Sequence, residues 1–366
     1  MPLHLSLYLD AIRVLAAVVV FLGHFSQGWL GGGLFWQAQV HAHTAVLVFF
    51  VLSGYVIAFT ADTKERTLND YAVARLSRLL SVVLPALLLS AALLFAGEAL
   101  NPAHYAELAR RGHGHTQTSL IGQFFAGLFF LSESWALHVR VLSNTPYWSL
   151  AYEFWYYAIF GCIHFLRGRQ RVIAATVACL IAGPKILLMA PIWIAGVAAW
   201  RWRHRVAPGA ALTLAIGTAL VIAVLISGPV RSISGGPGGV WWPMEFRYTD
   251  HLIGFSFALH IAAVGAITTK GIAIPHSLAK MMAKMIKGFA SYTFSIYLFH
   301  FPLLVFLGAI LPGQPDDPAR WASLLITTSF AIFALAQISE KRRTLVKTTL
   351  GRILQAIAKR AQPERL

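Results

Sequence analysis

Three ionisable side chains interrupt the first apolar run of the sequence, LDAIRVLAAVVVFLGH, namely Asp10, Arg13 and His24. Arg13 and His24 are eleven residues apart, so on a helix they share one face, about 16 Å apart along the axis. Ionisable groups inside a membrane span are costly and usually mark function. A neutral imidazole can act as a general base, and a guanidinium suits a phosphate or a developing oxyanion. We therefore predict that His24 and Arg13 are catalytic and that Asp10 supports Arg13; a packed histidine is the alternative for His24.

Two arginines in the sequence ARLSR form a second candidate, Arg75 and Arg78. They lie one helical turn apart at the start of an apolar run. Paired guanidinium groups at this place can hold the phosphates of a cytosolic carrier such as coenzyme A. The alternative is simple anchoring of the helix at the cytoplasmic surface, which basic residues commonly provide.

An acidic residue, Glu153, lies among aromatic side chains in the segment YWSLAYEFWYY, residues 147–157. The aromatic residues alone are typical of a membrane interface. A carboxylate inside a span is expected to pair with a cation or to orient an imidazole. We predict a catalytic role for Glu153, in which it orients His24, and supporting roles for Trp148 and Ser149.

A second intramembrane histidine, His300, precedes Pro302 in the segment SYTFSIYLFHFP. A histidine next to a helix-kinking proline can line the same cavity as His24, although a purely structural histidine is equally compatible with the pattern.

The remaining histidines and the two cysteines lack the spacing of metal ligands, so no metal is predicted. The sequence has no G-x-S-x-G motif, and Ser53 in VLSGY follows a helix, which disfavours a covalent serine mechanism.

The composition places these residues in a membrane. The chain of 366 residues is 57% hydrophobic and 12% charged, about half the charged fraction of a soluble domain. The net charge of +16 comes from Lys and Arg in short loops and not from one face of a soluble fold, so nucleic acid is not an expected partner. Ten apolar spans are predicted: 8–30, 44–61, 77–97, 147–166, 172–184, 185–200, 209–228, 250–269, 288–311 and 321–339.

Basic residues predict how these spans are oriented. Five segments contain 22 of the 30 Lys and Arg residues, namely 61–78, 167–171, 201–205, 270–287 and 341–366. By the positive-inside rule these segments are cytoplasmic, and so are both termini. Counting the apolar stretch 119–131 as a span would place segment 167–171 on the wrong side, so that stretch is predicted to be an interfacial or re-entrant outer segment.

The predicted fold is therefore an all-α membrane protein with about ten transmembrane helices. Residues 172–200 are too few for two full spans and contain Pro184 and Pro191, so short, broken helices at a cavity are expected, with a shallow hairpin as the alternative. Residues 341–366 are predicted to form a basic amphipathic tail on the inner leaflet.

In these motifs the chain resembles the acyltransferase 3 family of bacterial integral-membrane O-acyltransferases. The resemblance rests on five ordered segments and on Glu340 after the last span; the segments are LDAIRVLAAVVVFLGH, VFFVLSGYVI, ARLSRLLSVVLPALL, PYWSLAYEFWYY and SYTFSIYLFHFPLL. It implies a domain over residues 1–340 in the bacterial inner membrane. It also implies transfer of an acyl group, usually acetyl, from cytosolic acyl-coenzyme A to a hydroxyl of a cell-surface or exported glycan.

Carried over residue by residue, the resemblance makes Arg13 and His24 catalytic and places Arg75 and Arg78 near coenzyme A. The hypothesis is that His24 removes the acceptor proton while Arg13 stabilises the thioester oxyanion or the donor phosphate. Membrane lipids are expected partners, and an oligomer is compatible with the sequence. The alternative function is a transporter or flippase for a glycolipid or small anion, in which the same charged groups would bind substrate or relay protons.

Overall fold

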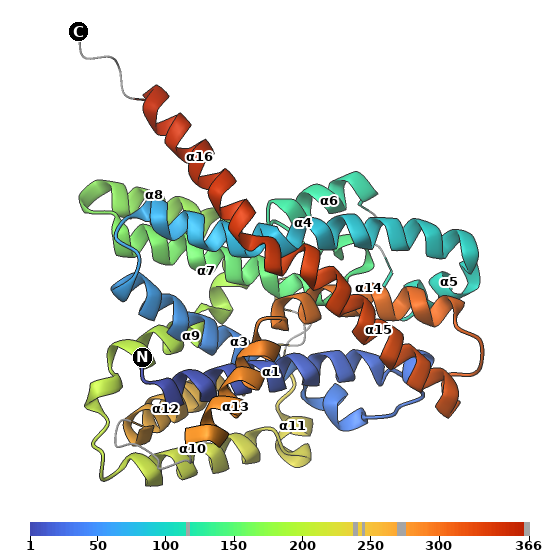
Figure 1. Ribbon diagram of the computed structural model, residues 1–366, viewed down its shortest axis with the longest axis horizontal. Helices are drawn as coiled ribbons and strands as arrows, with labels where there is room; N and C mark the ends of the chain where they lie inside the picture. Colours follow the sequence, from blue (N-terminus) through green and yellow to red (C-terminus); the bar gives the residue numbers. More distant parts are fainter. Residues whose placement is uncertain (115–117, 237–240, 244–245, 269–275, 362–366) are drawn as a thin grey trace.

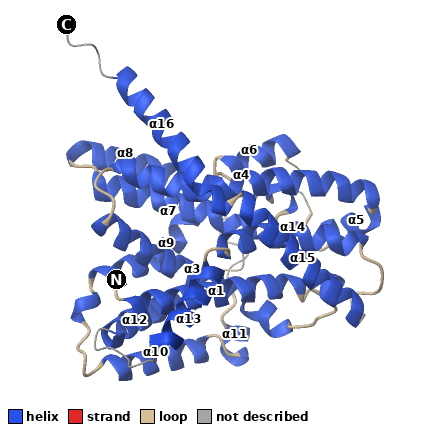
Figure 2. Cartoon of the chain, in the orientation of Figure 1, coloured by secondary structure: helices blue, strands red, loops and turns tan. Residues whose placement is uncertain are grey.

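The computed structural model describes residues 1–114, 118–236, 241–243, 246–268 and 276–361, and every regular element in these ranges is a helix (Figures 1 and 2). One isolated bridge joins Gly235 and Arg247. The predicted all-α class is confirmed. Residues 270–275 of one predicted cytoplasmic segment and residues 362–366 of the predicted tail lie outside the described residues.

The helices of the N-terminal half are α1 (Leu3–Phe25), α2 (Gly28–Gly31), α3 (Trp36–Thr63), α4 (Leu68–Leu100), α5 (Pro102–Arg110), α6 (Leu120–Leu128), η1 (Val141–Ser143), η2 (Thr145–Tyr147) and α7 (Trp148–Phe165). Those that follow are α8 (Gly168–Ala182), α9 (Pro184–Arg201), η3 (Arg203–Arg205), α10 (Ala211–Leu225), α11 (Gly228–Ile233), α12 (Asp250–Thr268), α13 (His276–Ala290), α14 (Thr293–Ile310), α15 (Pro318–Ile338), η4 (Glu340–Arg342) and α16 (Arg343–Ala361).

A helix occupies each of the ten predicted spans, but fewer helices meet the requirements for crossing a bilayer. Among the described residues six are long and apolar enough: Leu3–Phe25, Trp36–Thr63, Leu68–Leu100, Asp250–Ile267, Thr293–Ile310 and Pro318–Ile353. The bent pair α8 and α9 makes a seventh if it is one span. The total of ten spans and the cytoplasmic position of both termini stay predictions.

The predicted outer segment 119–131 contains only a nine-residue helix, α6. This is too short to cross a bilayer, which needs about 20 helical residues. Its assignment as interfacial or re-entrant stays a prediction.

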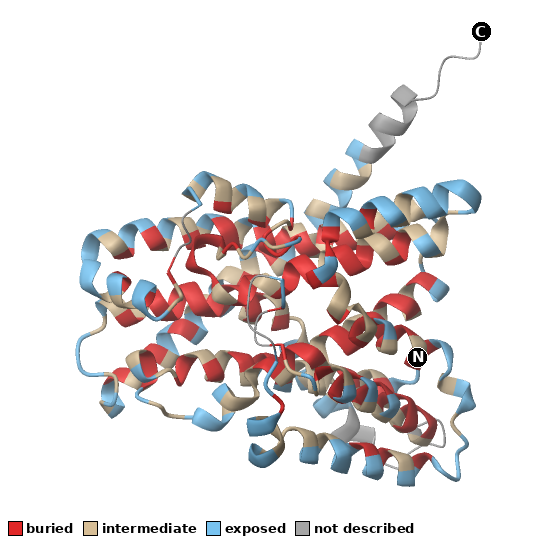
Figure 3. Ribbon diagram, turned by 180° about the vertical axis from the view of Figure 1, so that it is seen from behind, coloured by how far each residue is buried: buried red, intermediate tan, exposed pale blue. Residues whose placement is uncertain are grey.

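Exposed apolar side chains cover the outside of the bundle, and buried ones fill its centre (Figure 3). On α15, for example, Ile326 is 69% exposed and Phe330 is 72% exposed. Side chains of this kind are stable on an outer surface when lipid covers them. The pattern supports a multi-pass membrane protein.

Close packing of α3 against α9 forms the centre of the bundle. A Cβ atom added to Gly54 would lie 2.0 Å from the carbonyl oxygen of Trp193, and one added to Gly196 would lie 2.0 Å from that of Val51. Only glycine allows two helix backbones to approach this closely. The approach brings Trp193 within hydrogen-bonding distance of Ser53, whose Oγ accepts from the indole Nε1 at 3.2 Å.

The predicted break within 172–200 falls between α8 and α9, which are bent by 116°. Beside the bend lies a buried ion pair, in which Lys185 Nζ and Glu133 Oε2 are 2.8 Å apart. His138 Nδ1 contacts the other oxygen of the same carboxylate at 2.8 Å. The ion pair fastens the loop before α7 to the start of α9. How often this region crosses the membrane stays a prediction.

The predicted tail begins with α16, which leaves the bundle at a slant (Figure 1). Its first residue, Arg343, donates from Nη2 to the carbonyl oxygen of Ala74 on α4 at 2.9 Å. The boundary between residues 340 and 341 and the position of the tail on the inner leaflet stay predictions.

Candidate active site

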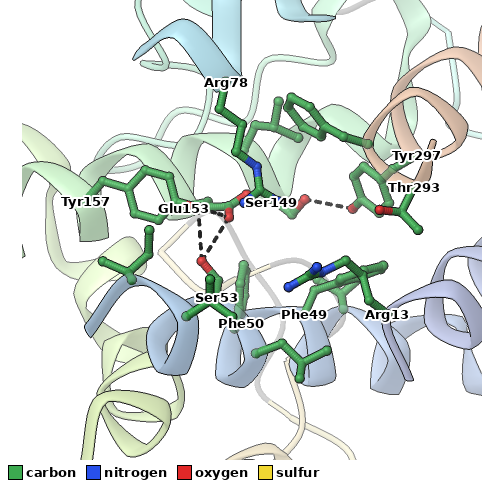
Figure 4. Close-up of a pocket in the computed structure, with 16 residues that line it drawn as sticks. Arg13, Phe49, Phe50, Ser53, Arg78, Ser149, Glu153, Tyr157, Thr293 and Tyr297 are labelled. Carbon is green, nitrogen blue, oxygen red and sulfur yellow. Dashed lines mark hydrogen bonds between the residues drawn. The ribbon is translucent and has the colours of Figure 1, made fainter. Parts of the chain in front are cut away.

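A cavity at the centre of the bundle collects polar side chains from five helices that are far apart in the sequence. Arg13 comes from α1, Ser53 from α3, Arg78 from α4, Glu153 from α7 and Tyr297 from α14 (Figure 4). Its volume is about 60 Å³, which holds a few water molecules, since one needs about 10–15 Å³. A narrow space inside a membrane bundle whose apolar lining carries several charged and hydroxyl groups is a candidate substrate site.

Glu153 organises one wall of the cavity. Ser149, Glu153 and Tyr157 follow one another at single-turn spacing on α7, so their side chains share a face. Glu153 Oε1 accepts hydrogen bonds from Ser53 Oγ at 2.9 Å and from the hydroxyl of Tyr157. The carboxylate is therefore held by two hydroxyl groups. It does not contact His24, the residue that we predicted it to orient.

The cavity also contains two guanidinium groups from opposite walls, those of Arg13 and Arg78 (Figure 4). Arg13 Nη1 donates to Asp10 Oδ1 at 3.0 Å, and the supporting role of Asp10 stays a prediction. The guanidinium of Arg78 makes no hydrogen bond to any residue in the described ranges, although it interacts electrostatically with Glu153. A cation without a hydrogen-bond partner beside a second cation is suited to bind an anion.

Arg75 is directed away from the cavity. Its guanidinium forms a buried ion pair with Glu65 and donates to Thr60 Oγ1 at 3.1 Å. Both partners lie at or just beyond the end of α3, so Arg75 ties α4 to that end. The structure thus separates the two arginines of ARLSR: Arg75 is held by partners at the end of α3, whereas Arg78 lines the cavity.

His24 and His300 meet in a second polar cluster. His24 Nδ1 lies 3.1 Å from His300 Nε2, and the two rings pack against Phe301 and Phe21. His24 does not line the cavity that contains Arg13. Because both residues are on α1, their Cα atoms are about 16 Å apart along its axis. The cavity thus reaches one member of the predicted catalytic pair, and the histidine cluster contains the other.

Ser149 and Trp148 have different positions relative to the cavity. Ser149 lines it, and its Oγ lies 2.7 Å from the hydroxyl of Tyr297. Trp148 packs behind the wall, with its ring stacked on His43 at 6.5 Å between centroids and edge-on to Phe50. Trp148 therefore supports Phe50, which does line the cavity.

Four hydroxyl-bearing cavity residues were not identified from the sequence as functional, namely Ser53, Tyr157, Thr293 and Tyr297. A hydroxyl in the middle of an apolar span is a weak signal, because serine and tyrosine often hydrogen-bond between membrane helices without any other role. The contacts of Ser53 with α7 and α9 depend on helix packing, which the sequence pattern does not reveal.

No group of three or more metal-ligating side chains is found among the residues that the structure describes.

Comparison with known protein families finds a match over residues 6–337 to a family model described as an acyltransferase domain. No curated protein and no solved structure matches the chain.

Proposed function

The chain belongs to the acyltransferase family whose model it matches from residue 6 to residue 337, and from this premise we propose that it is an O-acyltransferase of the bacterial inner membrane. The proposed donor is cytosolic acyl-coenzyme A, with acetyl as the usual acyl group. The proposed acceptor is a hydroxyl of a cell-surface or exported glycan.

The observation that supports this proposal most directly is the pair of guanidinium groups in the central cavity. Coenzyme A carries phosphates, and Arg78 offers a guanidinium that makes no hydrogen bond to a described residue. Arg13, which retains Asp10 as a partner, adds a second positive charge on the opposite wall. A donor held there by its phosphates would extend its pantetheine arm towards the rest of α1.

The separation of Arg13 and His24 favours one of the two roles that we considered for Arg13. A group that stabilises the oxyanion must lie about 3 Å from the reacting carbonyl oxygen, and a general base must be within hydrogen-bonding distance of the attacking hydroxyl. Side chains that begin about 16 Å apart on one helix do not meet both conditions in this structure. We therefore propose that Arg13 binds the charged part of the donor.

In the proposed reaction His24 accepts the proton of the acceptor hydroxyl. The hydroxyl oxygen then attacks the thioester carbonyl, the carbon–sulfur bond breaks, and coenzyme A leaves as its thiolate. Glu153 has its role in donor binding, before this step. Its hydrogen bonds to Ser53 and Tyr157 shape the cavity wall along which the pantetheine arm would pass.

The test has two readouts: release of free coenzyme A by purified protein in detergent, and mass spectrometry of surface glycans from cells that express each variant. We expect His24→Ala and Arg13→Ala to abolish both. Matched controls are His204→Ala and Arg205→Ala, which change exposed residues outside the cavity. Full activity of Arg13→Ala or of His24→Ala at normal protein level would reject the assignment. Glycan transport without consumption of acetyl-coenzyme A would favour the transporter.

A further inference from the structure

Two histidines from helices that are far apart in the sequence make a direct side-chain contact. His300 is fully buried on α14, and its Nε2 lies 3.1 Å from Nδ1 of His24 on α1. Each ring also contacts a backbone carbonyl oxygen one turn earlier in its own helix. His300 Nδ1 lies 2.8 Å from the oxygen of Ile296, and His24 Nδ1 lies 2.9 Å from that of Val20.

These three contacts determine where the ring protons are. A carbonyl oxygen only accepts, so each Nδ1 must carry a hydrogen to bond to its carbonyl. A neutral imidazole has one hydrogen, so Nε2 of His300 carries a lone pair. The hydrogen on Nδ1 of His24 then lies between two acceptors, the carbonyl oxygen of Val20 and Nε2 of His300. Nε2 of His24 is left with a lone pair and with no hydrogen bond to any described residue.

The opposite arrangement of protons is unfavourable. If His300 donated from Nε2 to His24, lone pairs on both Nδ1 atoms would face carbonyl oxygens at 2.8 and 2.9 Å. Two buried repulsive contacts would replace two hydrogen bonds, each of which is costly to lose. The geometry therefore selects a single pair of tautomers.

We propose that His300 is the positioning residue for His24, an inference that rests on the proposed function. By accepting from Nδ1, His300 holds the His24 ring in place and keeps Nε2 as the nitrogen that receives the acceptor proton. After the transfer, the same lone pair stabilises the imidazolium of His24. A neutral imidazole provides this acceptor without burying a second charge, which would be costly away from water.

Pro302 leaves a carbonyl oxygen near His300 open to a partner from outside α14. Proline has no backbone N–H, so the carbonyl of Leu298, four residues earlier, loses its helical partner. Asn144 Nδ2 donates to that carbonyl oxygen at 3.0 Å. This contact anchors α14 beside His300 to the segment that precedes α7.

The test compares His300→Gln, His300→Asn and His300→Phe in the full-length protein. The amide oxygen of glutamine can reach the position of Nε2, whereas that of the shorter asparagine reaches only the position of Nδ1. We expect His300→Gln to retain kcat within about tenfold, and the other two to lose about 100-fold or more, the scale of general-base catalysis. KM for acetyl-coenzyme A should change little in all three, because the donor cavity does not include His300.

A structural role would give a different order. If all three variants lost activity together with thermal stability, or if His300→Phe kept the wild-type kcat, the inference would be overturned. Inactive wild-type protein, or a fully active His24→Ala variant, would instead reject the proposed function.

Nitrogen-15 NMR of histidine-labelled wild-type protein gives an answer that does not depend on variants folding. Nδ1 of His24 should be protonated and Nε2 unprotonated at neutral pH, and the reverse pattern would contradict the proposal.

Discussion

Ser53 on α3 donates a hydrogen bond of 2.9 Å to Glu153 on α7, 100 residues later in the sequence. The same carboxylate oxygen accepts from Tyr157, and Ser53 in turn accepts from Trp193. Three helices are thereby joined at the wall of one cavity. The network gives a part-buried carboxylate two hydroxyl partners, and the guanidinium of Arg78 interacts with that carboxylate electrostatically without a hydrogen bond to it.

This network predicts coupled effects of Ser53 and Glu153 on activity. Ser53→Ala and Glu153→Gln should each reduce acetyl transfer at least about tenfold, and the double variant should be scarcely worse than either, because both changes remove the same contact. A double-mutant cycle on kcat/KM measures this coupling. Ser323→Ala, at an exposed serine that bonds only within its own helix, is the control. Strictly additive losses would show that the two residues act separately.

The two arginines of ARLSR should respond differently to replacement. Arg75→Gln leaves Glu65 as an unpaired buried charge and should lower the free energy of unfolding by about 3 kcal/mol. Arg78→Gln removes a cation that interacts electrostatically with Glu153 but has no hydrogen-bond partner among the described residues, so it should lower stability less than Arg75→Gln and raise KM for acetyl-coenzyme A about tenfold. Thermal unfolding and steady-state kinetics of both variants separate these effects. Equal effects of both variants on KM would contradict the division of roles.

The buried ion pair between Lys185 and Glu133 should be more costly to break than to replace. Lys185→Met strands the carboxylate of Glu133, which is 0% exposed, and should destabilise the protein by about 3–5 kcal/mol. Lys185→Met combined with Glu133→Gln removes both charges and should recover much of that loss. The measurement is the thermal unfolding temperature in detergent. A double variant less stable than Lys185→Met would show that the charges themselves are required.

Close packing of α3 and α9 predicts that Gly54→Ala is severely destabilising. The added methyl would lie 2.0 Å from the carbonyl oxygen of Trp193, so the two backbones must separate, and overpacking of this kind costs about 1–3 kcal/mol or more. Gly217→Ala is the matched control, because nothing lies within 4 Å of its added Cβ atom. Expression level and unfolding temperature report the difference. Equal stability of the two variants would show that the helices are not in close contact.

The predicted orientation can be tested with single cysteines at two exposed arginines, after replacing Cys162 and Cys179 with serine. Arg110→Cys should react with a membrane-impermeant maleimide in cells whose outer membrane has been opened. Arg169→Cys should react only after the inner membrane is permeabilised, because its basic segment is predicted to be cytoplasmic. The reverse pattern of labelling would invert the orientation and place the donor site on the wrong side.

The sequence by itself determined the features that depend on local order along the chain. Long apolar runs predict helices that need lipid, and the helices that the structure contains coincide with them. The spacing of Arg13 and His24 places both on α1, and Pro184 predicts the break after Ala182. Such features follow from helical periodicity and from the missing N–H of proline, so neighbours in space are not needed to infer them.

Only the tertiary structure decided which of these side chains meet. Helical periodicity tells which residues share a face, but it does not tell which other helix that face contacts. The pairing of Arg75 with Glu65, of Glu153 with Ser53 and of His24 with His300 depends on how helices pack after they form. That packing is decided by close contacts such as those at Gly54 and Gly196, where the absence of a side chain allows two backbones to approach.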